Sequence, residues 1–151
     1  MSALNWIKAQ GEAASSALKG EIARFNNRKF MQGAVAIGVA IAAADGTIDQ
    51  DEKRKLYGVF QNLEALKAFK WDTVQPLFDE LKGKYDFDAE IGLAEAMKYV
   101  GALRNDPAAA RQLIRIGIMV GGADGTFDDK EKDVVRKACR ELGLSPADFE
   151  L

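Results

Sequence analysis

The chain has 151 residues, of which 48% are apolar and 29% are charged, and its net charge is −2. This composition supplies one buried core and a solvated surface, and it excludes the strongly basic balance typical of nucleic-acid-binding proteins. The sequence contains no histidine and a single cysteine, which excludes Ser/His and Cys/His catalytic pairs, an internal disulfide and most zinc, iron or copper sites.

The sequence shows no targeting or membrane segment. Its first ten residues, MSALNWIKAQ, contain no long apolar run, and no stretch approaches the roughly 18 apolar residues of a membrane span. A cytoplasmic protein is therefore expected, since the sequence has neither a signal peptide nor paired cysteines. The one cysteine, Cys139, lies on a helical stretch beside Val135 and Leu142, so it is predicted to be a small core residue.

The first element, residues 3–25, has widely spaced apolar side chains such as Leu4 and Ile22. Its middle, GEAASSA, offers few anchors for a core, so we expect either an amphipathic helix that frays or partial disorder up to about residue 20. The sequence is therefore divided into an N-terminal amphipathic segment, residues 1–24, and a helical domain, residues 25–151.

The rest of the chain carries apolar residues at helical spacing, and no alternating stretch indicates a strand. Asp106 followed by Pro107 marks a helix start, and Gly143 favours a helix end. The sequence thus predicts an all-α, single-domain helical bundle. Its helices are expected at residues 29–44, 49–62, 73–84, 86–103, 107–123 and 128–142, with a short turn from residue 145.

An internal repeat is the most informative feature of the sequence. Residues 44–53 read ADGTIDQDEK and residues 123–132 read ADGTFDDKEK, so the two stretches correspond position by position. The preceding stretches correspond in the same register, with AIGVAIAA at 36–43 and RIGIMVGG at 115–122. Two copies of a helix–loop–helix unit predict a pseudo-two-fold arrangement in which the two apolar helices pack together.

Helix capping alone explains most of each repeat. Asp49 and Glu52, like Asp128 and Glu131, have the spacing of a capping box at the start of the following helix. The glycine shortly before each of these aspartates favours the end of the preceding helix. On this interpretation the two acidic loops need no ligand.

Capping does not explain Asp45 and Asp124. Each is predicted to follow a helix C-terminus, where the helix dipole disfavours a carboxylate by about 0.3–1 kcal/mol. Clustered carboxylates repel one another unless a cation or a basic side chain, such as that of Lys53 or Lys132, lies among them. A low-affinity site for Ca²⁺, Mg²⁺ or Mn²⁺ is therefore the second interpretation. An EF-hand is excluded, because the acids of the first half of its loop are missing. The candidate metal ligands are Asp45, Asp49 and Glu52 in the first loop and Asp124, Asp128 and Glu131 in the second.

Further acids lie at the start of the helix expected from residue 86 and within it. Asp86, Asp88 and Glu90 are typical of a helix N-terminus, where the dipole favours negative charge. Glu95 lies among apolar neighbours. If buried, its carboxylate needs a cationic partner or a metal ion.

Three blocks of the sequence resemble the TerB family of tellurite resistance proteins. They are KFMQGAVAIGVAIAAADGTIDQDEK at 29–53, DFDAEIGLAEAMKYV at 86–100 and IGIMVGGADGTFDDKEK at 116–132. The resemblance implies an all-helical fold, a cytosolic role in bacterial stress and tellurite resistance, and no enzymatic activity. It also implies association with other Ter proteins and with the membrane protein TerC, hence a peripheral position at the inner membrane, and metal binding at the two acidic loops.

Two functions follow from these observations. The first is a non-enzymatic stress-response protein that binds divalent cations at its acidic loops, docks on partner proteins and uses no organic cofactor. The second is a purely structural interaction module whose acidic loops are helix caps only. A metal-dependent hydrolase ranks below both, because the sequence offers no phosphate loop, arginine clamp or positioned base.

Overall fold

The computed structural model describes residues 28–44, 48–62, 67, 69–123 and 127–151. The predictions for the N-terminal segment lie outside these residues. Within them the chain forms α-helices and one 3₁₀ helix and no strand, so the all-α prediction is confirmed. The elements are α3 (Arg28–Ala42), α4 (Gln50–Asn62), α5 (Trp71–Phe87), α6 (Ala89–Gly101), α7 (Pro107–Gly121), α8 (Asp129–Glu141) and η2 (Pro146–Phe149).

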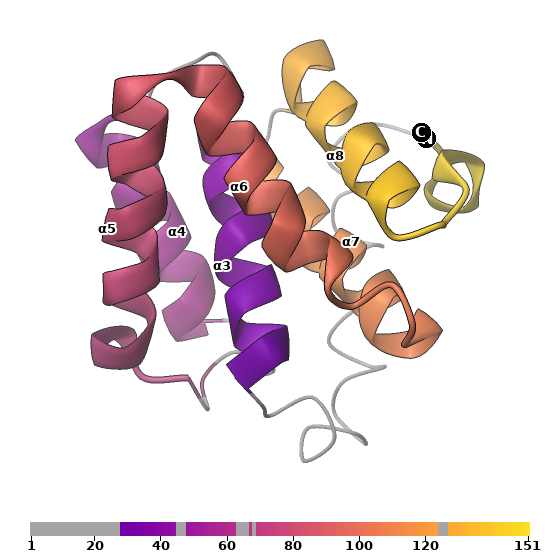
Figure 1. Cartoon of the computed structure of the whole chain (residues 1–151), viewed down its shortest axis with the longest axis horizontal. Helices are drawn as coiled ribbons and strands as arrows, with labels where there is room; N and C mark the ends of the chain where they lie inside the picture. Colours follow the sequence, from indigo (N-terminus) through magenta and orange to yellow (C-terminus); the bar gives the residue numbers. More distant parts are fainter. Residues whose placement is uncertain (1–27, 45–47, 63–66, 68, 124–126) are drawn as a thin grey trace.

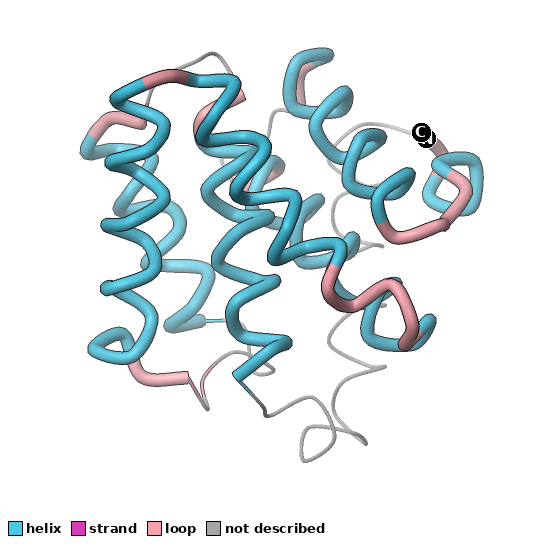
Figure 2. The backbone as a smooth tube through the Cα atoms, in the orientation of Figure 1, coloured by secondary structure: helices cyan, strands magenta, loops and turns pink. Residues whose placement is uncertain are grey.

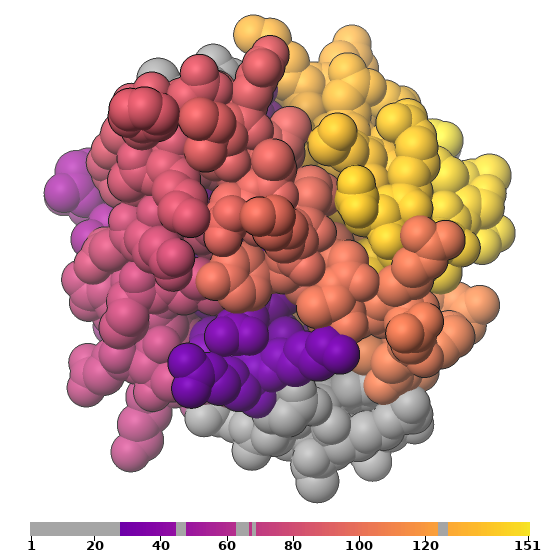
Figure 3. Space-filling model, in the orientation of Figure 1, coloured from indigo at the N-terminus to yellow at the C-terminus, as the bar shows by residue number. Residues whose placement is uncertain are grey.

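Helix α3 runs through the middle of the bundle and contacts every other α-helix of the described chain (Figure 1). Its sequence is apolar on all sides, as expected of a helix enclosed by others, and most of its residues are buried. Helices α4 and α5 lie on one side of it and α7 and α8 on the other, and loops join the helices at the two ends of the bundle (Figure 2). Side chains fill the spaces between the helices on the face shown in Figure 3.

Small residues allow the close helix contacts. At Gly38 of α3, an added Cβ would lie 2.5 Å from Cδ1 of Leu56 in α4. At Gly117 of α7, an added Cβ would lie 2.8 Å from Cδ1 of Ile37 and 2.9 Å from Cδ1 of Ile41, both in α3. These distances are shorter than van der Waals contact, so alanine at either position would displace the ends of the buried Leu56, Ile37 or Ile41 side chains.

The helix bounds follow the register of the sequence repeat. Helices α3 and α7 each have 15 residues, and α4 and α8 each have 13 residues. Both pairs begin and end at positions that correspond in the repeat. The helix contacts correspond as well. Helices α3 and α7 pack on each other, and each also packs on the second helix of the other repeat unit, α3 on α8 and α7 on α4. The prediction that the two apolar helices pack together is confirmed, whereas a pseudo-two-fold axis relating the two units stays a prediction.

The boundary between α5 and α6 differs from the sequence prediction. The first helix was expected to end at Lys84 and the next to begin at Asp86, but α5 continues to Phe87 and α6 begins at Ala89. Asp88 lies between them in an extended conformation, with φ −163° and ψ 125°. Its side chain accepts hydrogen bonds from two backbone N–H groups of the first turn of α6, at 2.8 and 3.2 Å. Asp88 is therefore the N-cap of α6.

Among the residues that the structure describes, no helix is long and apolar enough to cross a bilayer.

Candidate functional site

The first acidic loop leads into α4 through a capping box. The backbone N–H of Glu52 donates to Oδ1 of Asp49 at 2.9 Å, and the backbone N–H of Asp49 donates to Oε2 of Glu52 at 3.3 Å. Ile48, directly before the cap, is 7% exposed and anchors the loop to the core. The predicted capping role of this pair is confirmed.

The second acidic loop is built in the same way at the start of α8. The backbone N–H of Glu131 donates to Oδ1 of Asp128 at 2.8 Å, and the backbone N–H of Asp128 donates to Oε1 of Glu131 at 3.1 Å. Phe127, directly before the cap, is buried over Gly121, where an added Cβ would lie 2.6 Å from its ring. Both loops thus have a buried side chain followed by a reciprocal carboxylate–backbone pair.

The two capping boxes lie at the same end of the bundle. Helices α4, α6 and α8 all begin at the upper end in Figure 1, and an aspartate, Asp49, Asp88 or Asp128, caps each start. Asp49 and Asp128 are exposed. Three capping aspartates therefore lie at one end of the bundle.

The complete ligand sets proposed from the sequence are not brought together among the described residues. Asp45 and Asp124 lie outside those residues. Of each predicted set the structure therefore describes two members, which lie together: Asp49 with Glu52, and Asp128 with Glu131. In the part of the chain that the structure describes, no three carboxylates or thiols gather as a metal-binding group. Metal binding at the loops stays a prediction.

The capping role and a cation-binding role are chemically compatible. In each box one oxygen of Asp49 or Asp128 accepts one backbone hydrogen bond, whereas an ionised carboxylate has about four acceptor positions. Lys53, a possible neutralising cation beside the first loop, instead lies with its Nζ 5.5 Å from the centre of the Phe78 ring. A lysine ammonium group and an aromatic ring at this distance attract each other through the quadrupole of the ring.

Glu95 has the cationic partners that its partial burial requires. Its carboxylate lies 3.3 Å from Nζ of Lys84 and 3.4 Å from Nζ of Lys98. Burial raises the pKa of the Glu95 carboxyl, but hydrogen bonds and charge from the two lysines outweigh this effect and lower the pKa below its ordinary value. Glu95 is thus accounted for by ion pairing, and it carries no argument for a metal.

Cys139 is buried in α8, as predicted for a core residue. The pKa of its thiol is raised to about 11, chiefly by burial, while the charge of Arg140 lowers the pKa and that of Asp148 raises it. A thiol with so high a pKa is protonated at neutral pH and is a poor nucleophile.

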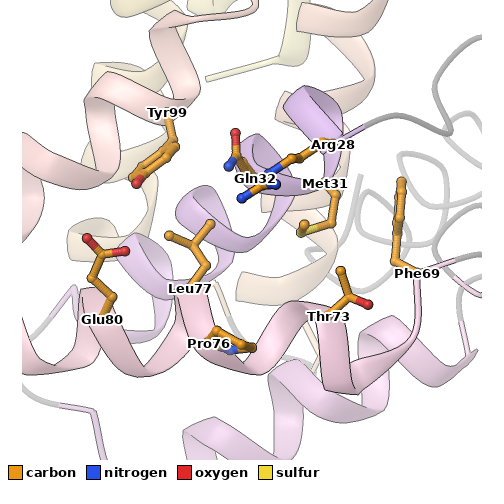
Figure 4. Close-up of a pocket in the computed structure, with 9 residues that line it drawn as sticks. All are labelled: Arg28, Met31, Gln32, Phe69, Thr73, Pro76, Leu77, Glu80 and Tyr99. Carbon is orange, nitrogen blue, oxygen red and sulfur yellow. The ribbon is translucent and has the colours of Figure 1, made fainter.

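A groove between α3, α5 and α6 was not anticipated from the sequence (Figure 4). Its volume is about 590 Å³. The three helices that form it come from separate parts of the chain, and no sequence motif indicates that they meet. The residues that line it are Arg28, Met31, Gln32, Phe69, Thr73, Pro76, Leu77, Glu80 and Tyr99.

Comparison with known proteins gives two matches. The family model described as tellurite resistance protein TerB matches residues 31–151. A curated protein of Alcaligenes sp., the tellurium resistance protein TerB, is 38% identical over 118 residues, which are 78% of this chain and 97% of that protein. No solved structure matches the chain.

Proposed function

The chain belongs to the TerB family of tellurite resistance proteins, and on that premise we propose how it acts in tellurite resistance. Its role is that of a non-enzymatic protein that binds divalent cations at its two acidic loops and docks on partner proteins. The partners are other Ter proteins and the membrane-bound TerC, which the family resemblance implies. Docking on TerC would hold a cytoplasmic protein at the inner membrane.

The repeated acidic loop is the observation that carries the cation proposal. The same spacing of acids recurs in the two loops, before helices whose bounds follow the register of the repeat. In each copy an aspartate and a glutamate already lie together in a capping box. Carboxylate oxygens are the ligands preferred by Ca²⁺, Mg²⁺ and Mn²⁺, and Asp45 or Asp124 would supply a third group to each pair.

The chemistry of the chain favours binding over catalysis. Its sequence has no histidine to serve as a base near pH 7. The one thiol is buried and has a raised pKa, so it is a poor candidate for a nucleophile. These two observations support a non-enzymatic role for the protein.

Residue-resolved NMR titration with CaCl₂, MgCl₂ and MnCl₂ tests the cation proposal. Saturable Ca²⁺-dependent shifts are expected in the loops before α4 and α8, together with Mn²⁺-induced line broadening centred on the same amides. Sodium chloride at equal ionic strength is the control for general screening of surface charge. Absence of localised changes with all three cations would contradict the proposal.

A purely structural interaction module is the second candidate function. Both capping boxes are complete without a cation, and this observation favours it. If the protein is only a structural interaction module, Asp49→Asn and Asp128→Asn should leave it fully functional in a cellular tellurite-resistance assay, because asparagine caps a helix about as well as aspartate. Under the cation proposal the same substitutions weaken a hard-cation site and reduce resistance.

A further inference from the structure

The groove between α3, α5 and α6 has the size and construction of a small-molecule site. Its volume of about 590 Å³ lies within the roughly 300–1,000 Å³ usual for such sites. Thr73, Leu77 and Glu80 follow one another at helical spacing along one face of α5. Figure 4 shows them facing Arg28 and Gln32 of α3, with Tyr99 of α6 beside them.

The floor and one end of the groove are apolar. Met31, Phe69 and Leu77 are 5%, 9% and 9% exposed, so they belong to the core and present only part of their surface to the groove. Phe69 lies at the end away from Glu80 and Tyr99 (Figure 4). An apolar ligand body of a few carbons would gain free energy by leaving water along this floor.

The described polar side chains around the floor are one cation, Arg28, one carboxylate, Glu80, and three neutral groups that can donate or accept hydrogen bonds. Arg28, Gln32, Thr73 and Tyr99 all line the groove, and within the described chain none of them makes a side-chain hydrogen bond or ion pair. Among the described residues of the lining Glu80 is the one carboxylate, and its Oε1 lies 4.0 Å from Nζ of Lys84. The Arg28 guanidinium is cationic and can only donate, whereas the Gln32 amide and the Thr73 and Tyr99 hydroxyl groups can donate or accept. An anionic acceptor is therefore the head group that the guanidinium favours and the other three can also bind.

We propose that this groove binds a small organic anion that has a carboxylate or phosphate head on a short alkyl body. The Arg28 guanidinium holds the head through charge-assisted hydrogen bonds, with donors from Gln32 and Tyr99 beside it. The apolar body lies over Met31 and Leu77 towards Phe69. This activity goes beyond cation binding and partner docking, and it does not involve the acidic loops.

The test is an NMR titration of the full chain with three probes that share one tail: octanoate, octyl phosphate and octylammonium. We expect saturable shifts at groove amides, including those of Gln32, Thr73 and Tyr99, with either anion, and much weaker binding of the cation. The tighter of the two anions identifies the head group. Equal binding of octylammonium, or shifts that do not localise to the groove, would overturn the proposal.

Matched variants separate the site from general electrostatics. Arg28→Gln should weaken octanoate binding about tenfold or more, because a hydrogen bond to a charged group contributes about that factor. Lys29→Gln removes the same charge at the neighbouring residue, which is exposed and does not line the groove, and should change binding little. Tyr99→Phe, which removes one hydroxyl, should weaken binding severalfold. Equal effects of the Arg28 and Lys29 substitutions would show that no defined anion site exists.

Discussion

Replacing Gly92 by alanine tests how closely α5 and α6 pack. A Cβ at this position would lie 2.5 Å from Cγ, 2.6 Å from Cδ2 and 2.8 Å from Cα of Tyr85. Tyr85 is 5% exposed and its Cα belongs to the backbone, so a rotamer change alone cannot make room and the helices must separate. Overpacking of this kind costs about 1–3 kcal/mol, with values at or above the upper end expected when backbone must move.

The magnitude follows from two opposing effects. Alanine gains about 1 kcal/mol over glycine inside a helix, which leaves a net destabilisation of about 2 kcal/mol or more for Gly92→Ala. For a chain of this size that corresponds to a fall of at least roughly 4–8 °C in Tm. Thermal and urea unfolding followed by circular dichroism measure both quantities.

Gly83→Ala is the matched control. Gly83 is exposed in α5, and an added Cβ there meets nothing within 4 Å. Only the helix-propensity gain applies, so this variant should be more stable than the parent by up to about 1 kcal/mol. The packing argument is refuted if Gly92→Ala unfolds at the same temperature as Gly83→Ala or above it.

Three further predictions concern single side chains. Asp128→Ala should lose about 1 kcal/mol of stability in urea unfolding, and Asp128→Asn should stay close to the parent; equal losses would contradict the capping role. Glu95→Gln should be less stable than the parent at pH 7. Because Lys84 and Lys98 lower the folded-state pKa of Glu95, that difference should disappear as the pH falls below about 4, and a difference that persists in acid would argue against ion pairing. Cys139, whose thiol pKa is raised to about 11, should resist iodoacetamide at pH 8 in the folded protein and react in urea; rapid reaction of the folded protein would place the thiol outside the core.

Local sequence signals predicted the features that depend on local interactions. Helical periodicity gave the all-α fold, and the spacing of Asp49 and Glu52 gave the capping box that forms at α4. A capping box requires only backbone groups within one turn, so its residues can be identified without knowledge of the rest of the chain.

Features that depend on tertiary contacts were missed or misplaced. The helix expected from Thr73 begins earlier, at Trp71. The Trp71 ring packs edge-on against Tyr57 of α4, with ring centres 5.0 Å apart, and this contact cannot be inferred from the sequence around Trp71 alone. The groove was missed for the same reason, since Arg28, Leu77 and Tyr99 meet only when three helices assemble.

One comparison of thermal stability tests most directly whether the repeated acidic loops bind a divalent cation. Tm is measured for the parent and for the double variant Asp45→Asn/Asp124→Asn, each with and without millimolar Ca²⁺. A ligand that binds only the folded state stabilises it, so Ca²⁺ should raise the Tm of the parent and have little effect on the variant. If Ca²⁺ leaves the Tm of the parent unchanged, or raises both proteins equally, the loops are helix caps and the cation proposal is wrong.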